Sequence, residues 1–548
     1  MEHNDRKSST FFFLLKVFIA VLFFITFFQL PNYAQTRDTF HYSPTYVLGI
    51  ESLREENYDT ALEYFKKEVA DNPQNGYAWS LIAIISNEND DLDYALESIN
   101  KAIPLFKNDK EALYRAYRER SHIYLNRDEQ KNALSDLSML IKLEPDSTDG
   151  YNLRGNYYYE TGSYKKSNAD FREVVRLAPD KTSGYMGIGR NLIALKEYDK
   201  AIAEFNHCME ISPEYCQPYS FRGEANYLQG KLDEAAHDAF KALELNYDRK
   251  AWDLVGTLAD TIYTKIDSML IIKHTQDQDN TLWYHLHGMV SENNEHYREA
   301  INYYLQVAEK DPLPQTWERL SKCFENIGEL RSAITCLSRA YDADTTRIEN
   351  LLFRADLEDK VEMFDMAFSD ISKFIIYYPE EIMGYYQRAY ISMHTNNLSQ
   401  AIEDFTKCIE LDPEDYSLYM MRAYTYMHLG DTITAMKDWE YIAANDNELG
   451  VSNAGMYALF WIGKPEKALA WLDQMLKMTD DISGCYYDAS CLHSIMGHNK
   501  EAIDYLRKAI EAGFNDFNNI RHDWDMDNIR QLPEFKELIS QYDKVQQK

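Results

Sequence analysis

The sequence predicts an all-α protein built as an α-solenoid of tandem antiparallel helix pairs, closed by a C-terminal capping helix. Apolar residues recur every three or four positions through most of the chain, a spacing typical of one face of an α-helix. An alanine or serine returns mostly at steps of 33 or 34 residues, which indicates a stacked helical repeat. Glycine (21) and proline (14) are scarce among the 548 residues, which disfavours long linkers and a turn-rich β fold.

The N-terminal end carries a long apolar run at 11–30, preceded by Arg6 and Lys7. A charged start, an apolar middle and a small residue such as Ala34 at the cleavage point are typical of a secretory signal. We therefore expect residues 1–34 to be a signal peptide. The mature protein is then exported, with the periplasm of a Gram-negative bacterium as the expected location.

The alternative is that this segment stays in place as a signal anchor, because Glu2 and Asp5 weaken the basic start. A retained run at 11–30 would anchor the protein in the inner membrane, facing the periplasm. Only in that case is a membrane an expected partner. A short linker is expected at 35–41.

The clearest repeat unit runs from Gly184 to Pro213. Two apolar-striped helices are expected in it, at 185–195 and 198–209, joined by a polar bend at 196–197. Pro213 ends the unit because proline cannot continue a helix. Neither helix can bury its apolar face alone, so neighbouring units must stack.

Two positions in each unit hold small residues. Near the start of the second helix, twelve units have alanine and two have serine; twelve positions earlier, on the first helix, Met456 is the one residue that is not small. Small side chains let two helices cross closely, and a bulky apolar residue four positions after the alanine faces the gap. The residues at the alanine position are Ala61, Ala95, Ala133, Ser167, Ala201, Ala235, Ser268, Ala300, Ala333, Ala367, Ala401, Ala435, Ala468 and Ala502.

The unit containing Tyr219, Gly223, Tyr227 and Ala235 resembles the tetratricopeptide repeat (TPR), whose signature is W-x2-L-G-x2-Y, then A-x3-F, then P, at a period of 34. The resemblance extends over about fourteen units, repeats 1–6 at 42–248 and repeats 8–14 at 281–516. It implies a right-handed TPR superhelix whose concave groove is lined by the first helix of each pair. It also implies a non-catalytic scaffold or adaptor that holds another protein or peptide in that groove.

Two segments depart from the pattern. The degenerate repeat at 249–280 keeps Trp252 and Gly256 but has Ser268 at the alanine position and lacks the closing proline, which predicts a local change of curvature. Residues 517–548 are not a repeat. They are expected to form a loop and one amphipathic helix that cap the exposed core of the last unit.

The groove of the last four units is predicted to be rich in tyrosine and methionine. Such a stripe, where water is expected, favours a surface that binds a protein or peptide. The alternative is that this end coils tightly and packs the stripe against its own neighbours. The candidate residues are Tyr386, Tyr390, Met393, Met420, Tyr424, Met427, Tyr457, Phe460 and Tyr487.

Other chemistry is not indicated. The net charge of −32 disfavours nucleic acid as a partner. No catalytic or cofactor-binding motif is found, and no metal site is predicted. Asp523, Asp525, Asp527 and Glu534 copy the carboxylate spacing of an EF-hand loop, but Asn528 replaces its glycine, so capping of the final helix by these aspartates is the preferred interpretation.

The seven cysteines show no metal-ligand spacing and are expected to be structural thiols. Cys323 with Cys336, and Cys485 with Cys491, are candidates for disulfides. Two functional alternatives to a groove-binding scaffold stay open. One is a membrane-tethered structural subunit of a cell-envelope assembly, and the more remote one is an enzyme or glycan-binding protein on a TPR scaffold.

Overall fold

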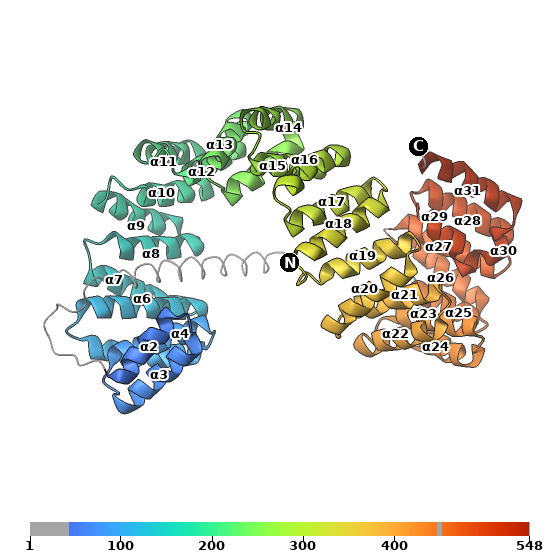
Figure 1. Ribbon diagram of the computed structural model, residues 1–548, viewed down its shortest axis with the longest axis horizontal. Coiled ribbons are helices and arrows are strands. Elements are labelled where there is room, and N and C mark those ends of the chain that lie inside the picture. Colours follow the sequence, from blue (N-terminus) through green and yellow to red (C-terminus); the bar gives the residue numbers. More distant parts are fainter. Residues whose placement is uncertain (1–42, 447–451, 480, 547–548) are drawn as a thin grey trace. The chain divides into compact units, whose positions relative to one another are not determined.

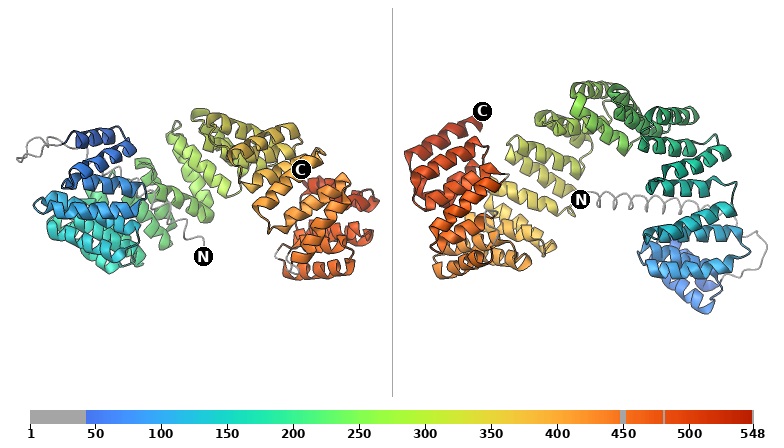
Figure 2. Two further views of the ribbon diagram at one scale, coloured as in Figure 1. Left: turned by 90° about the horizontal axis from the view of Figure 1, so that it is seen from below. Right: turned by 180° about the vertical axis from the view of Figure 1, so that it is seen from behind.

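The computed structural model describes residues 43–446, 452–479 and 481–546. The predicted signal segment at 1–34 and the linker at 35–41 lie outside these residues. Two compact units divide the chain, one ending at Ala251 and the other beginning at Trp252. In both units, consecutive helices lie side by side as antiparallel pairs (Figures 1 and 2). The predicted all-α solenoid of helix pairs is confirmed.

Each pair has a first and a second helix. In the N-terminal unit the pairs are α2 (Pro44–Arg54) and α3 (Tyr58–Asp71), α4 (Gly76–Glu88) and α5 (Leu92–Ala102), α6 (Lys110–Asn126) and α7 (Gln130–Leu143), α8 (Thr148–Glu160) and α9 (Tyr164–Leu177), α10 (Thr182–Ala194) and α11 (Tyr198–Ile211), and α12 (Cys216–Leu228) and α13 (Leu232–Leu245). A short 3₁₀ helix, η1 (Ile103–Phe106), follows α5 and lengthens that unit.

In the C-terminal unit the pairs are α15 (Thr281–Asn293) and α16 (Tyr297–Lys310), α17 (Pro314–Asn326) and α18 (Leu330–Ala343), α19 (Glu349–Lys360) and α20 (Phe364–Tyr377), α21 (Ile382–His394) and α22 (Leu398–Leu411), α23 (Tyr416–Leu429) and α24 (Thr432–Asn445), α25 (Asn453–Trp461) and α26 (Pro465–Met478), and α27 (Ile482–Ile495) and α28 (Asn499–Glu511). The tail follows as α29 (Phe517–His522), η2 (Trp524–Met526), α30 (Asp527–Arg530) and α31 (Pro533–Gln546).

The small positions do pack against aromatic rings, as the sequence predicts. A Cβ atom added to Gly189 on α10 would lie 2.5 Å from the ring of Phe205 on α11, and one added to Gly288 would lie 2.6 Å from Tyr304. Phe205 and Tyr304 are fully buried. The interior of these pairs is therefore built from a gap on one helix and a ring on the other.

The turn inside each helix pair contains a residue with positive φ, seven positions after the small residue of the first helix. Thirteen units share this conformation, six with glycine and seven with another residue. These residues are Glu56, Asp90, Asp128, Gly162, Lys196, Gly230, Glu295, Gly328, Glu362, Asn396, Gly430, Gly463 and Gly497. A left-handed residue at this point reverses the chain with no longer loop.

The degenerate repeat lacks this turn. Its two helices run together as α14 (Arg249–Gln276), with a kink at Ile262, where φ is −128° and ψ is 44°. A Cβ added to Gly256 would meet only Met289 Cε, at 3.4 Å, and Asn293 Nδ2, at 4.0 Å, so the close ring contact of other units is lost. This unit departs from the regular geometry where its sequence departs from the repeat.

A substitution at the turn tests its backbone conformation. Lys196 has a φ of 61°. This left-handed conformation is unfavourable for a residue with a Cβ atom but not for glycine. We expect Lys196→Gly to raise the local unfolding free energy of the α10–α11 pair by about 0.5–1 kcal/mol, measured by native-state hydrogen exchange. The control Lys200→Gly, inside α11, should lower it by about 1 kcal/mol. A loss of stability in both variants would contradict the assignment.

The tail forms the predicted cap. Phe535, Leu538 and Ile539 of α31 are buried, and Leu532 packs against the same cluster. In Figure 1 the tail helices lie beside α27 and α28. Among the residues that the structure describes, no helix has the length and apolar character that crossing a membrane requires.

Candidate functional site

The nine predicted groove residues all lie on first helices of the C-terminal unit, α21, α23, α25 and α27. Met420, Tyr457 and Tyr487 are buried. The other six are half-buried: Tyr386, Tyr390, Met393, Tyr424, Met427 and Phe460. We call the side of these four helices that carries the nine residues the first-helix surface.

Neighbouring members of this surface contact one another. The hydroxyl of Tyr386 donates a hydrogen bond to that of Tyr390 at 3.1 Å, and both rings lie edge-on to the buried Phe405. Tyr424 packs edge-on against Tyr457, with ring centroids 6.0 Å apart. Part of the predicted stripe therefore belongs to the chain's own interior, and that part fits the packing alternative.

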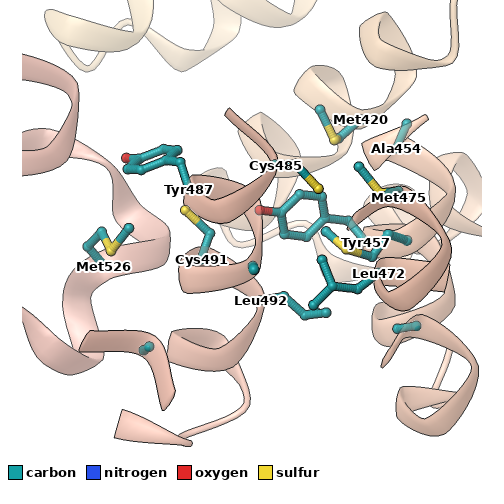
Figure 3. Close-up of a cluster of buried hydrophobic side chains, with 14 of the residues drawn as sticks. Met420, Ala454, Tyr457, Leu472, Met475, Cys485, Tyr487, Cys491, Leu492 and Met526 are labelled. Carbon is teal, nitrogen blue, oxygen red and sulfur yellow. The ribbon is translucent and has the colours of Figure 1, made fainter. Parts of the chain in front are cut away.

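The tail covers another part of the stripe. Tyr424 on α23 donates its hydroxyl hydrogen to Asp525 Oδ2 at 3.3 Å, and Tyr487 on α27 donates to Asp523 Oδ2 at 2.7 Å. The ring of Tyr487 also stacks on Phe514, at a centroid distance of 4.3 Å. Figure 3 shows Tyr487 and Cys491 on the side of α27 that faces Met526.

Further contacts hold the tail in this place. The Cys491 thiol donates to Asp523 Oδ2 at 3.7 Å, and the side chain of Asn528 donates to the Ser494 carbonyl at 2.8 Å. The ring of Trp524 lies against His428 of α23. The sequence alone predicted the tail as an end cap but not its reach to α23. Whether the remaining half-buried part of the stripe binds a partner stays a prediction.

The cluster between tail and helices is acidic. Burial raises the pKa of Asp525 well above its ordinary value, and the negative charges of Asp523 and Asp488 add to the shift. Burial also raises the pKa of Asp488 to about 7. Cys491, Asp523 and Asp525 each have one ligand-type atom within 4.8 Å of the other two. The hydroxyl of Tyr457 interacts with both Asp525 and Cys491.

The EF-hand spacing does not produce an EF-hand arrangement. Asp523 caps the short 3₁₀ helix η2, since its Oδ1 accepts a hydrogen bond from the backbone N–H of Asp525 at 2.9 Å. The prediction placed this cap on the final helix, α31, which begins ten residues later, at Pro533. Asp527 pairs with Arg530, and Glu534 is exposed in the first turn of α31. These carboxylates therefore face different surroundings.

The structure contains a series of buried arginine–aspartate pairs that were not predicted from the sequence. In six units the arginine just before the small position of the first helix binds, with two parallel N–H groups, the aspartate sixteen residues later on the second helix. In one of them, Arg388 donates from Nε and Nη2 to Asp404 at 2.9 and 2.7 Å, and from Nη1 to Ser372 of the preceding unit at 3.4 Å. The pairs are Arg120–Asp136, Arg154–Asp170, Arg222–Asp238, Arg354–Asp370, Arg388–Asp404 and Arg422–Asp438.

The unit after the degenerate repeat replaces this pair with aromatic rings. His287 and Tyr303 occupy the two positions and stack with ring centroids 3.8 Å apart. His287 is fully buried, with Nε2 2.7 Å from Asp267 Oδ1, and His274 of α14 lies 5.0 Å from it between ring centroids. Burial lowers the pKa of His287 to about 4, so at neutral pH an uncharged imidazole donates to Asp267.

The cysteines are free thiols in the structure, and six of the seven are buried. Cys208 and Cys408 sit in the interior of their units, and each donates to a backbone carbonyl of the first helix, at 3.7 Å. Burial raises the pKa of both thiols to about 12, which keeps them protonated and unreactive. The expected structural role fits this environment.

Comparisons with known proteins agree with the repeat pattern. Family models described as "Tetratricopeptide repeat" match residues 46–110, 148–181, 182–215, 384–415, 405–437 and 483–512. A curated chloroplastic protein of Arabidopsis thaliana is 31% identical over 84 residues, which are 15% of this chain and 25% of that protein. The match thus spans about a quarter of that relative's length.

The solved structures that match this chain share little sequence with it. A tetratricopeptide repeat protein from Parabacteroides merdae has 16% identity and a TM-score of 0.35, over 51% of this chain and 97% of that one. The C-terminal part of a TPR repeat-containing protein from Cytophaga hutchinsonii has 17% identity and a TM-score of 0.34, over 50% and 99%. The family matches and the stacked helix pairs together identify this chain as a tetratricopeptide repeat protein.

Proposed function

We propose that this protein is an exported, non-catalytic scaffold that binds a segment of another protein on its first-helix surface. TPR domains generally serve as protein-interaction scaffolds, and one observation supports this use here. The first-helix surface already holds a stretch of non-repeat chain, since Tyr424 and Tyr487 donate hydrogen bonds to Asp525 and Asp523 of the tail. A surface that holds a chain segment in this way has the chemistry to bind a peptide.

Export remains part of the proposal. It is supported by the apolar run at 11–30 behind Arg6 and Lys7, whether this segment is cleaved or kept as an anchor. A membrane-tethered subunit of an envelope assembly would use the same surface from a fixed position. The net charge of −32 favours a protein partner over nucleic acid.

Site-specific photo-cross-linking in intact cells of the source organism tests the proposal. A photoreactive phenylalanine at Met393 or Met427, both half-buried on first helices, is expected to capture a discrete partner found in the cell-envelope or periplasmic fraction. The same probe at Ile376 or Ile433, each 77% exposed on a second helix, should capture little. Equal capture from both surfaces would contradict the binding site, and partners confined to the cytosol would contradict export.

A further inference from the structure

The tail from Asp516 to Arg530 binds the first-helix surface in the manner of a peptide ligand. Its contacts extend over three successive first helices, α23, α25 and α27. The pair formed by Tyr424 and Asp525 joins residues 101 positions apart. Capping the last repeat requires contact with α27 and α28 only, so the reach to α23 is an additional interaction.

Hydroxyl and thiol groups of the first helices donate hydrogen bonds to carboxyl oxygens of the tail. Asp523 accepts from Tyr487 and Cys491, and Asp525 accepts from Tyr424. Between the two aspartates, Trp524 places its ring against His428. The surface therefore recognises two acceptor side chains that flank an aromatic ring.

Docking of the tail depends on the ionisation of the carboxyl groups at the contact. Asp488 of α27 faces the same cluster, so docking brings three carboxyl groups together in a half-buried space. Arg530 donates instead to the backbone carbonyl of Asp523 and to Asp527. Three ionised carboxylates at close range repel one another, and a retained proton relieves the repulsion.

We propose that the surface formed by Tyr424, Tyr457 and Tyr487 is a peptide-binding site that the chain's own segment Asp516–Arg530 occupies while its carboxyl cluster retains a proton. The segment leaves the site when that proton is lost. The vacated site then accepts a partner segment with acceptors on both sides of an aromatic ring. This last step rests on the proposed function, whereas release of the tail does not depend on it.

The groups that interact with Asp525 fix the direction of the pH effect. They are Tyr424 on α23, Tyr457 on α25, Tyr487, Asp488 and Cys491 on α27, and Asp523 of the tail. Next to them, His428 of α23 interacts with Asp527, which pairs with Arg530. Asp525 and Asp488 have raised pKa values when the tail is docked, so the docked state binds protons that the released state gives up. Docking is therefore strongest near the ordinary carboxyl pKa and weakens as pH rises through about 7, the pKa of docked Asp488, and beyond it.

Hydrogen exchange of the full chain, read by mass spectrometry and corrected for intrinsic rates, measures the release. Between about pH 5.5 and pH 8, the protection of residues 516–530 is expected to fall at least about tenfold, because one proton lost over one pH unit changes the equilibrium tenfold. Protection of α28 should stay unchanged, which separates tail release from unfolding. In Asp525→Asn, a neutral side chain still accepts from Tyr424 but has no proton to lose, so the protection of residues 516–530 should fall clearly less by pH 8 than in the wild type, with Asp488 as the remaining source of pH dependence.

The exposed Glu534→Gln serves as the matched control and should keep the pH dependence of the wild type. If Asp525→Asn loses protection in α28 at pH 5.5, Asp488→Asn takes its place, with the same expectation. The proposal would be overturned if the protection of residues 516–530 in the wild type did not change with pH. It would also be overturned if the wild type and the asparagine variant lost the same protection between pH 5.5 and pH 8. Photo-cross-linking at Met393 reports separately on partner binding, so the two proposals can fail independently.

Discussion

Arg388→Ala is expected to lower the stability of the α21–α22 pair by about 3–5 kcal/mol, because it leaves a buried carboxylate without its cation. Asp404 is 2% exposed, and Arg388 satisfies it with two N–H groups while also reaching Ser372 of the preceding unit. Native-state hydrogen exchange of α21 and α22 measures the loss, since unfolding of a repeat array is not reliably two-state.

The exposed pair Arg176–Glu173 provides the control, with side chains 60% and 41% exposed. Arg176→Ala should leave the exchange protection of α9 nearly unchanged, because water screens an exposed ion pair. Replacing both members of the buried pair, as in Arg388→Met with Asp404→Leu, should recover most of the loss, because no charge is then left alone. Equal effects of Arg388→Ala and Arg176→Ala would refute a structural role for the buried pair.

Phe205→Ala is expected to cost about 3–5 kcal/mol, through lost burial and the cavity left in the α10–α11 pair. Phe205 is fully buried, fills the gap above Gly189 and stacks on Phe221 with ring centroids 5.8 Å apart. Loss of the ring removes contacts within its own unit and with the next one. Native-state hydrogen exchange of α10 and α11 measures the effect.

Phe353→Ala is the comparison, because Phe353 is 59% exposed on α19. Its removal should change the stability by no more than about 0.5 kcal/mol. If both substitutions cost the same, the ring of Phe205 does not carry the packing that we assign to it.

Much of the fold could be predicted because it depends on the local periodicity of the sequence. The gap at Gly189 and the ring at Phe205 lie sixteen residues apart on neighbouring helices, so a short window contains both. The sequence also contains a signal for each of two features that were not predicted. An arginine directly before the small position marks the buried arginine–aspartate pairs. A glycine or polar residue seven positions after the small position marks the turns. Both are visible once the structure shows what these positions do.

The candidate site was less predictable. The periodicity showed that Tyr424 and Tyr487 belong to first helices, but not that Asp525 and Asp523 would cover them. The sequence pattern also did not predict the convergence of His274 and His287 beside α14, the helix in which a kink at Ile262 replaces the usual turn.

By itself the sequence determined the helix pairs, their close packing and the capping helix, because each depends on contacts within one repeat or between adjacent repeats. Only the tertiary structure decided that the tail folds back onto α23. That contact joins residues 101 positions apart and depends on small rotations between units, which add up along the solenoid. A repeating sequence pattern specifies how each unit packs on the next. The position of the end of the array, however, depends on the sum of the rotations between all the units.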